Sequence, residues 1–231
     1  MAELRNPDGT SGYYQHSRKV PFASRVSMAQ RRRMFQLFLE SFQPGSTTTV
    51  LDVGVTCDTS SPESNYFEQM YPHPHNIVCV ATEDGSHLMR TYPGLRYEQV
   101  HEGQPLPFRD REFDIAFSNA VLEHVGTRDA QRAFLREVCR VAKGFFVTTP
   151  NRWFPIEVHT GLPLLHHLPA PMFRGLIRNT RYKFWAEEAH LNLLGAREFG
   201  ALFPEHLAPT IRRVRLAGFT SNLVAFGRNP G

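Results

Sequence analysis

The sequence lacks an apolar run of the roughly 18–20 residues that a membrane-spanning helix needs, so we expect no membrane span. Its first residues also lack the apolar core of a secretory signal peptide. Cysteine is scarce, and the three cysteines have neither the even number of a disulfide framework nor the spacing of a metal-binding motif. We therefore expect reduced thiols and a cytoplasmic location.

A strong excess of one charge is lacking as well. The net charge of +4 comes from 26 basic and 22 acidic residues, too small an excess to indicate nucleic-acid binding by itself. The basic cluster at residues 31–33 lies within a helical pattern, and either a solvated helix face or a contact with an anionic partner fits it. An RNA partner would need a larger basic face or an added RNA-binding domain, so we do not expect one.

Apolar patterning predicts an α/β fold, and 231 residues suit a single domain spanning residues 1–231. Short apolar runs predict strands at residues 48–53, 76–81, 95–100, 113–118 and 144–149. Helical patterns lie at residues 27–42, 61–71, 84–90, 128–141, 171–178, 187–194 and 196–203. This alternation predicts a Rossmann-like, doubly wound, mostly parallel sheet with helices on both faces. Further strands at 211–217 and 221–227 predict an antiparallel last strand.

Two segments stand outside this alternation. Residues 1–24 are rich in Gly, Pro and polar residues and predict an irregular N-terminal arm, either a loose terminus or a flap over the site. Residues 151–192 are dense in Pro, His, Trp and Phe, and a stretch this long between core elements is more often functional than passive. We interpret it as an insertion that forms the substrate region.

Three sequence blocks carry the chemistry. Residues 50–58 show a buried-strand pattern with the acid Asp52, the glycine Gly54 and a small polar loop, as expected where a parallel strand delivers a ligand loop. Residues 106–114 read Leu-Pro-Phe-Arg-Asp-Arg-Glu-Phe-Asp, and residues 118–125 read Ser-Asn-Ala-Val-Leu-Glu-His-Val. The last two blocks lie at either end of the predicted fourth strand.

These blocks resemble those of the class I S-adenosylmethionine-dependent methyltransferases, in particular the small-molecule branch known as methyltransferase type 11. The resemblance implies a methyltransferase with S-adenosyl-L-methionine as its cofactor. In the family, the acid that matches Asp52 helps to place the methionine moiety, and the glycine that matches Gly54 lets the backbone approach the cofactor. Glu102 falls where the family has an acid near the adenine amino group, and the resemblance also assigns Asn119, after the fourth strand, to the cofactor site.

The cofactor region departs from the family pattern at two places. Thr56 stands where the family has its second glycine, and a β-branched residue restricts the backbone there, so the loop either widens or binds the cofactor differently. The second strand ends in Ala81 where the family has an acid for the ribose hydroxyls, and we expect Glu83 and Asp84 to reach that place through a shifted turn. The alternative is a methyltransferase-like binding or scaffold protein with weakened or lost cofactor binding.

The block that follows the fifth strand emerges at the same sheet edge as the cofactor loop. As a substrate pocket, it offers Arg152 for an anionic group and Trp153 for packing, with Asn151 as a further substrate contact. The other interpretation is a proline-ordered loop whose polar groups satisfy one another.

A hydroxyl or carboxyl acceptor needs a base near neutral pH, for which histidine is the natural candidate. The candidate catalytic residues are Glu157, His159 and His124, of which His124 also fits a structural role at a helix terminus. The spacing of His159, His166 and His167 matches no zinc pattern, so we expect no metal site.

The sequence also bears on the acceptor. The Asn/Asp-Pro-Pro-aromatic pattern typical of methylation at nucleobase amino groups and protein amides does not follow the fourth strand. The expected function is therefore S-adenosylmethionine-dependent methylation, at oxygen, of a small-molecule or glycan-type acceptor. The sequence predicts no particular oligomeric state.

Overall fold

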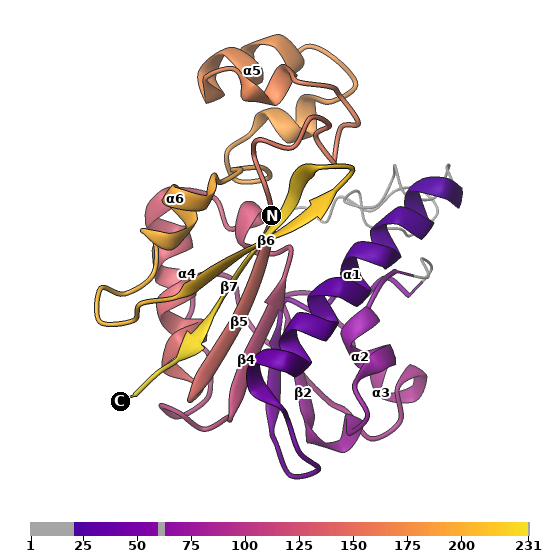
Figure 1. Cartoon of the computed structure of the whole chain (residues 1–231), viewed down its shortest axis with the longest axis vertical. Coiled ribbons are helices and arrows are strands. Elements are labelled where there is room, and N and C mark those ends of the chain that lie inside the picture. The colour runs from indigo at the N-terminus through magenta and orange to yellow at the C-terminus, as the bar shows by residue number, and fades with distance from the viewer. Residues whose placement is uncertain (1–20, 60–62, 231) are drawn as a thin grey trace.

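One mixed sheet organises the fold (Figure 1). The computed structural model describes residues 21–59 and 63–230. Its strands are β1 (Val50–Val53), β2 (Ile77–Ala81), β3 (Arg96–Gln99), β4 (Ile115–Asn119), β5 (Gly144–Pro150), β6 (Thr210–Leu216) and β7 (Phe219–Arg228). They lie in the order β3-β2-β1-β4-β5-β7-β6. Strands β1 to β5 pair in parallel, whereas β7 runs antiparallel to both β5 and β6, which confirms the predicted fold class.

Helices cover both faces of this sheet. The α-helices are α1 (Pro21–Phe42), α2 (Tyr66–Met70), α3 (Leu88–Thr91), α4 (Arg128–Arg140), α5 (Ala170–Ile177) and α6 (Ala196–Gly200). The 3-10 helices are η3 (Pro74–Asn76), η4 (Leu122–His124), η5 (Leu165–His167) and η6 (Lys183–Ala186). Figure 1 shows α1, α2 and α3 on one side of the sheet and α4 and α6 on the other. Across residues 21–59 and 63–230, no helix combines the length and the apolar character of a membrane span.

Aromatic side chains fill the core between α1 and the sheet. Phe38 of α1 is fully buried, and its ring centroid lies 5.1 Å from that of Phe67 in α2. The rings of Phe117 in β4 and Phe146 in β5 lie 5.9 Å and 5.5 Å from it. The apolar spacing predicted for this helix therefore forms its buried face. Strands β1, β2 and β5 are buried at every position because helices cover both of their faces.

The block at residues 106–114 has a clear structural role. The guanidinium of Arg140, at the end of α4, donates hydrogen bonds to the carbonyl oxygens of Leu106 and Phe108. It also pairs with the carboxylates of Asp110 and Glu137, each at 2.8 Å. These contacts fasten the block against α4 just before the chain enters β4.

Several predicted helix boundaries are wrong; the helix predicted at residues 84–90, for example, is α3 at Leu88–Thr91. Helix α1 begins at Pro21, so residues 21–24 of the predicted irregular arm are helical, while residues 1–20 lie outside the described part of the chain. Proline is compatible with the first turn of a helix because its missing N–H has no helical partner there.

The helix predicted at residues 187–194 does not form. Its backbone bonds to other elements instead. The Asn192 amide donates to the carbonyl of Glu123 at 2.7 Å, and the Asn192 carbonyl accepts from the side chain of Gln131. Arg128 of α4 donates to the carbonyl of Leu193 at 2.8 Å. These tertiary bonds replace the helical ones and hold the segment beside η4.

The region between β5 and α6 has a small core of its own. Its buried side chains are Phe173, Ile177, Trp185 and Leu191. Figure 1 shows α5 beyond the end of the sheet, in the part of the chain predicted to be the substrate region. The insertion therefore covers the edge at which β5 ends.

Candidate functional site

The candidate site lies where the loops after β1, β4 and β5 meet, because these three strands are neighbours in the sheet. The carboxyl edge at such a point is the usual ligand-binding edge of an open α/β sheet. The loop after β1 begins with Gly54, whose φ of 90° lies in the left-handed region. Its amide and that of Val55 both donate to the carbonyl of Val80, at 2.8 Å and 3.3 Å.

Gly54 lies against the loop after β4. A Cβ atom at this position would lie 2.9 Å from Cγ1 of Val121 and closer still to its Cγ2. Only glycine leaves room for this close approach of the two loops.

The Gly54→Ala variant tests this packing. The left-handed φ costs roughly 1–2 kcal/mol for alanine, and the collision with Val121 adds about 1–3 kcal/mol. We expect denaturant unfolding to show that Gly54→Ala lowers the unfolding free energy by the sum of these two costs. Gly218→Ala is the matched control, because Gly218 has a φ of 86° and no atom within 4 Å of the added Cβ. Equal losses of unfolding free energy in the two variants would contradict the close approach.

Thr56, which stands where the family has its second glycine, forms a local hydrogen bond. The Thr56 hydroxyl accepts from the amide of Asp58 at 3.2 Å and closes a turn of the loop. The next residue, Cys57, places its Sγ 3.8 Å from the carbonyl oxygen of Glu83. The structure thus brings the loop after β2 to the loop after β1 through the backbone of Glu83.

The predicted cofactor acids have different surroundings. The side chains of Glu83, Asp84 and Glu102 are exposed at the sheet edge. An Asp84 carboxylate oxygen accepts from the amide of Ser86 at 2.9 Å, whereas Glu102 lies in the turn after β3, two strands from β1. The structure therefore does not gather these three acids into one cluster.

Asp52, by contrast, is buried, with 5% of its surface exposed. Burial raises its pKa well above the usual range, and the neighbouring carboxyl of Glu68 raises it further. The thiol of Cys79 donates to Glu68 Oε1 at 3.5 Å. Burial and Glu68 thus both disfavour the ionised form of Asp52. Glu68 of α2, which lies outside every motif, was not predicted as its partner.

Asn119 connects three elements at the end of β4. Its side-chain oxygen accepts from the hydroxyl of Thr148 in β5 at 2.7 Å and from that of Tyr66 in α2 at 3.4 Å. The predicted cofactor residue is thus fixed in orientation by the strands and helix around it.

A cluster of acids and imidazoles lies on the neighbouring loops. Glu123 and His124 belong to η4, and Glu157 and His159 follow β5. His159 Nδ1 lies 2.7 Å from Glu157 Oε1, and the two imidazole rings lie edge to face with centroids 4.8 Å apart. The structure therefore brings together His124, Glu157 and His159, the three predicted catalytic residues.

Two side chains that were not predicted complete this cluster. Glu123 is fully buried and accepts from the hydroxyl of Thr149 at 3.0 Å. The ring of Trp185 lies 4.8 Å from that of His159. Glu123 lies within the block at residues 118–125, and this position was the one feature of the sequence that could have indicated a role in the site.

Burial and pairing set the charges in the cluster. Burial raises the pKa of Glu123 to about 7, against the opposing effects of His159 and Thr149. Burial and the nearby His159 lower the pKa of His124 to about 3. Burial alone would raise the pKa of Glu157, but His159 and the surrounding donors lower it to about 2. Glu157 therefore carries the negative charge that faces His159.

The predicted substrate residues do not all face one pocket. The side-chain amide of Asn151 is buried and donates to the carbonyl of Thr220 in β7 at 2.9 Å. The guanidinium of Arg152 donates to the carbonyl of Leu168 and lies 5.3 Å from the centre of the Trp153 ring. Trp153 is 54% exposed. Arg152 and Trp153 thus form one surface feature, whereas Asn151 joins strands.

Comparison with known proteins supports the fold. Residues 55–146 match the family model described as "Methyltransferase domain". A search of curated protein sequences finds no match.

Solved structures also match the chain. The N-methyltransferase NodS from Bradyrhizobium japonicum, in complex with S-adenosyl-L-homocysteine, has a TM-score of 0.57 at 14% identity. That match covers 99% of this chain and 95% of NodS. A SAM-dependent methyltransferase from Aquifex aeolicus has a TM-score of 0.56 at 15% identity, over 94% of this chain and 97% of the other. At these identities the structures are similar in fold.

The family match covers less than half of the chain, and the solved structures are similar to it in fold, so the chain has the fold of the methyltransferase domain.

Proposed function

We propose that this protein methylates an oxygen atom of a small-molecule or glycan-type acceptor in the cytoplasm. The observation that carries the proposal is the cluster of Glu123, His124 and His159 beside the loop of Gly54. The two loops touch through Val121, two residues before Glu123. An acceptor held at the cluster is therefore adjacent to the candidate cofactor loop.

The residues predicted to hold the cofactor are Asp52, Gly54, Thr56, Glu83, Asp84, Glu102 and Asn119. S-adenosylmethionine, when bound, supplies an electrophilic methyl group, and the protein supplies orientation. In its protonated form, which burial favours, Asp52 would donate a hydrogen bond, and the exposed acids would accept from hydroxyl and amino groups.

The cluster would receive the acceptor hydroxyl. Glu157 accepts hydrogen bonds from the amides of His159 and Thr160 as well as from His159 Nδ1. These bonds make Glu157 a positioning residue that fixes the ring of His159. The ring of His159 then faces the cluster with Nε2, and we propose that the acceptor hydroxyl binds beside this cluster. Trp185 packs against this ring and limits the access of water.

A transfer assay tests the acceptor atom. The protein is incubated with S-adenosylmethionine that carries a labelled methyl group and with matched hydroxylated and aminated small molecules and glycans. We expect label only in the hydroxylated members, as an ether or ester that nuclear magnetic resonance identifies. Transfer to amines or to RNA alone would contradict oxygen methylation.

One observation favours a second function, a binding protein for an anionic partner. A cavity of about 560 Å³ lies at the edge strand β6 and is lined by Ala196, Arg197, Ile211, Arg212, Arg213 and Arg215. Four of the six lining residues are arginines, and arginine favours anions. Such a protein would not need the cofactor, so cofactor binding separates the two functions.

A further inference from the structure

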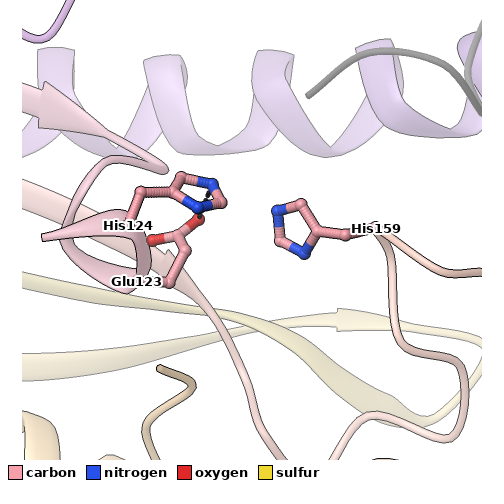
Figure 2. Close-up of side chains that lie close together, drawn as sticks. All are labelled: Glu123, His124 and His159. Carbon is pink, nitrogen blue, oxygen red and sulfur yellow. Dashed lines mark ion pairs between the residues drawn. The ribbon is translucent and has the colours of Figure 1, made fainter. Parts of the chain in front are cut away.

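Three side chains from two loops converge on one point. Glu123, His124 and His159 each offer a nitrogen or oxygen atom, and these atoms all lie within 4.8 Å of one another. His124 Nε2 and Glu123 Oε1 are 3.9 Å apart. Figure 2 shows a ring nitrogen of His159 directed toward the other two side chains from the opposite side. Two imidazoles and a carboxylate form the ligand set of a catalytic zinc site.

The outer contacts of these side chains fit the same interpretation. His159 Nδ1 bonds to the carboxylate of Glu157 at 2.7 Å, and His124 Nδ1 bonds to the carbonyl of His190 at 2.6 Å. Metal-bound histidines typically donate their other ring N–H to a carboxylate or a carbonyl in this way. The second oxygen of Glu123 accepts from Thr149. Each ligand is thus oriented by a partner on its outer side.

One polar atom of the cluster has no hydrogen-bond donor among the described residues. The Glu123 side chain is 0% exposed, and its Oε1 atom has no hydrogen-bond partner among them. A buried carboxylate oxygen without a donor is costly. A cation bound between this oxygen and the two imidazoles would satisfy it.

We propose that Glu123, His124 and His159 bind a zinc ion, with a further coordination position open toward the acceptor region. Ligand atoms about 2.0–2.2 Å from a tetrahedral zinc ion lie about 3.4 Å apart, so small side-chain movements close the site. The side chains of His124 and His159 are 18% and 10% exposed, which leaves a route of entry. An oxygen bound at the open position would lose its proton more easily.

The sequence did not predict this site because its ligands have no motif spacing. Glu123 and His124 are consecutive, and His159 follows 35 residues later on another loop. The histidines near His159 in sequence take another role, since His166 and His167 both bond to the carbonyl of Phe154.

Metal binding is tested without cofactor or acceptor, so its outcome is independent of the proposed function. The untagged full chain is treated with a chelator, dialysed and titrated with Co²⁺, whose visible absorption reports nitrogen and oxygen ligands. We expect a saturable absorption band at one Co²⁺ per chain that stoichiometric Zn²⁺ abolishes. The absence of both the band and Zn²⁺ binding by calorimetry would overturn the proposal.

Variants assign the ligands. We expect Glu123→Gln and His159→Gln to weaken Zn²⁺ binding at least about 100-fold, and Glu157→Gln to weaken it about 10- to 100-fold. His206→Gln, at an exposed position, serves as the matched control and retains wild-type affinity. Circular dichroism verifies that each variant is folded. Wild-type Zn²⁺ affinity in both ligand variants would place the metal elsewhere and overturn the proposal.

Discussion

The His159→Gln variant is expected to transfer methyl groups about 10²- to 10⁴-fold more slowly than the wild type. Its affinity for S-adenosylmethionine should not change. Glutamine keeps a donor for the buried carboxylate of Glu157, so the loop after β5 retains its conformation. It removes the imidazole nitrogen that faces Glu123 and His124, where the acceptor oxygen is proposed to bind. The measurement is kcat at saturating acceptor, together with cofactor affinity by calorimetry.

His206→Gln is the control for this experiment, because it makes the same chemical change at an exposed position far along the chain. Its kcat should equal that of the wild type. A His159→Gln enzyme with wild-type kcat would show that the cluster does not handle the acceptor, whether through the imidazole alone or through a bound metal.

The Phe38→Ala variant is expected to lose about 3–5 kcal/mol of unfolding free energy. Phe38 has no exposed surface, and its ring packs between α2 and the sheet against Phe67, Phe117 and Phe146. Truncation leaves a cavity that these large rings cannot fill without breaking their own contacts. Denaturant unfolding by circular dichroism measures the loss.

Phe219→Ala provides the matched control for Phe38→Ala. Phe219 is 55% exposed at the start of β7, and its truncation should change the unfolding free energy by less than about 0.5 kcal/mol. A loss below about 1 kcal/mol for Phe38→Ala would contradict the packing of α1 on the sheet.

Strands β1, β2 and β5 were predictable because each is a short apolar run that is buried at every position. Residues 76–81 and 144–149 correspond closely to β2 and β5, which are buried throughout. Helix α4 was predictable from its apolar spacing and extends over Arg128–Arg140, as predicted to within one residue. Local composition determines these elements, so local reasoning finds them.

Elements whose backbone bonds depend on distant residues were not predictable. The segment at 187–194 has helical spacing, yet its amide and carbonyl groups bond to Glu123, Arg128 and Gln131. Tertiary hydrogen bonds override a weak local preference there.

The candidate site shows the same division. Gly54 was identified from its place after a buried strand, and its left-handed backbone gives the physical reason. The pairing of Asp52 with Glu68 was not predictable, because α2 approaches β1 only in the folded chain. The convergence of Glu123 with His159 likewise depends on the meeting of two loops. Sequence motifs named the loops, but the fold decides which side chains share a site.

The most direct test of the account is calorimetric titration of the full chain with S-adenosylmethionine and with its demethylated product. We predict saturable binding of both, because Gly54 keeps the loop after β1 close to the loop after β4 and Thr56 closes the turn that follows. Asp52→Ala should weaken both. No heat and no thermal shift at about millimolar cofactor would contradict a cofactor-dependent methyltransferase and favour the anion-binding alternative.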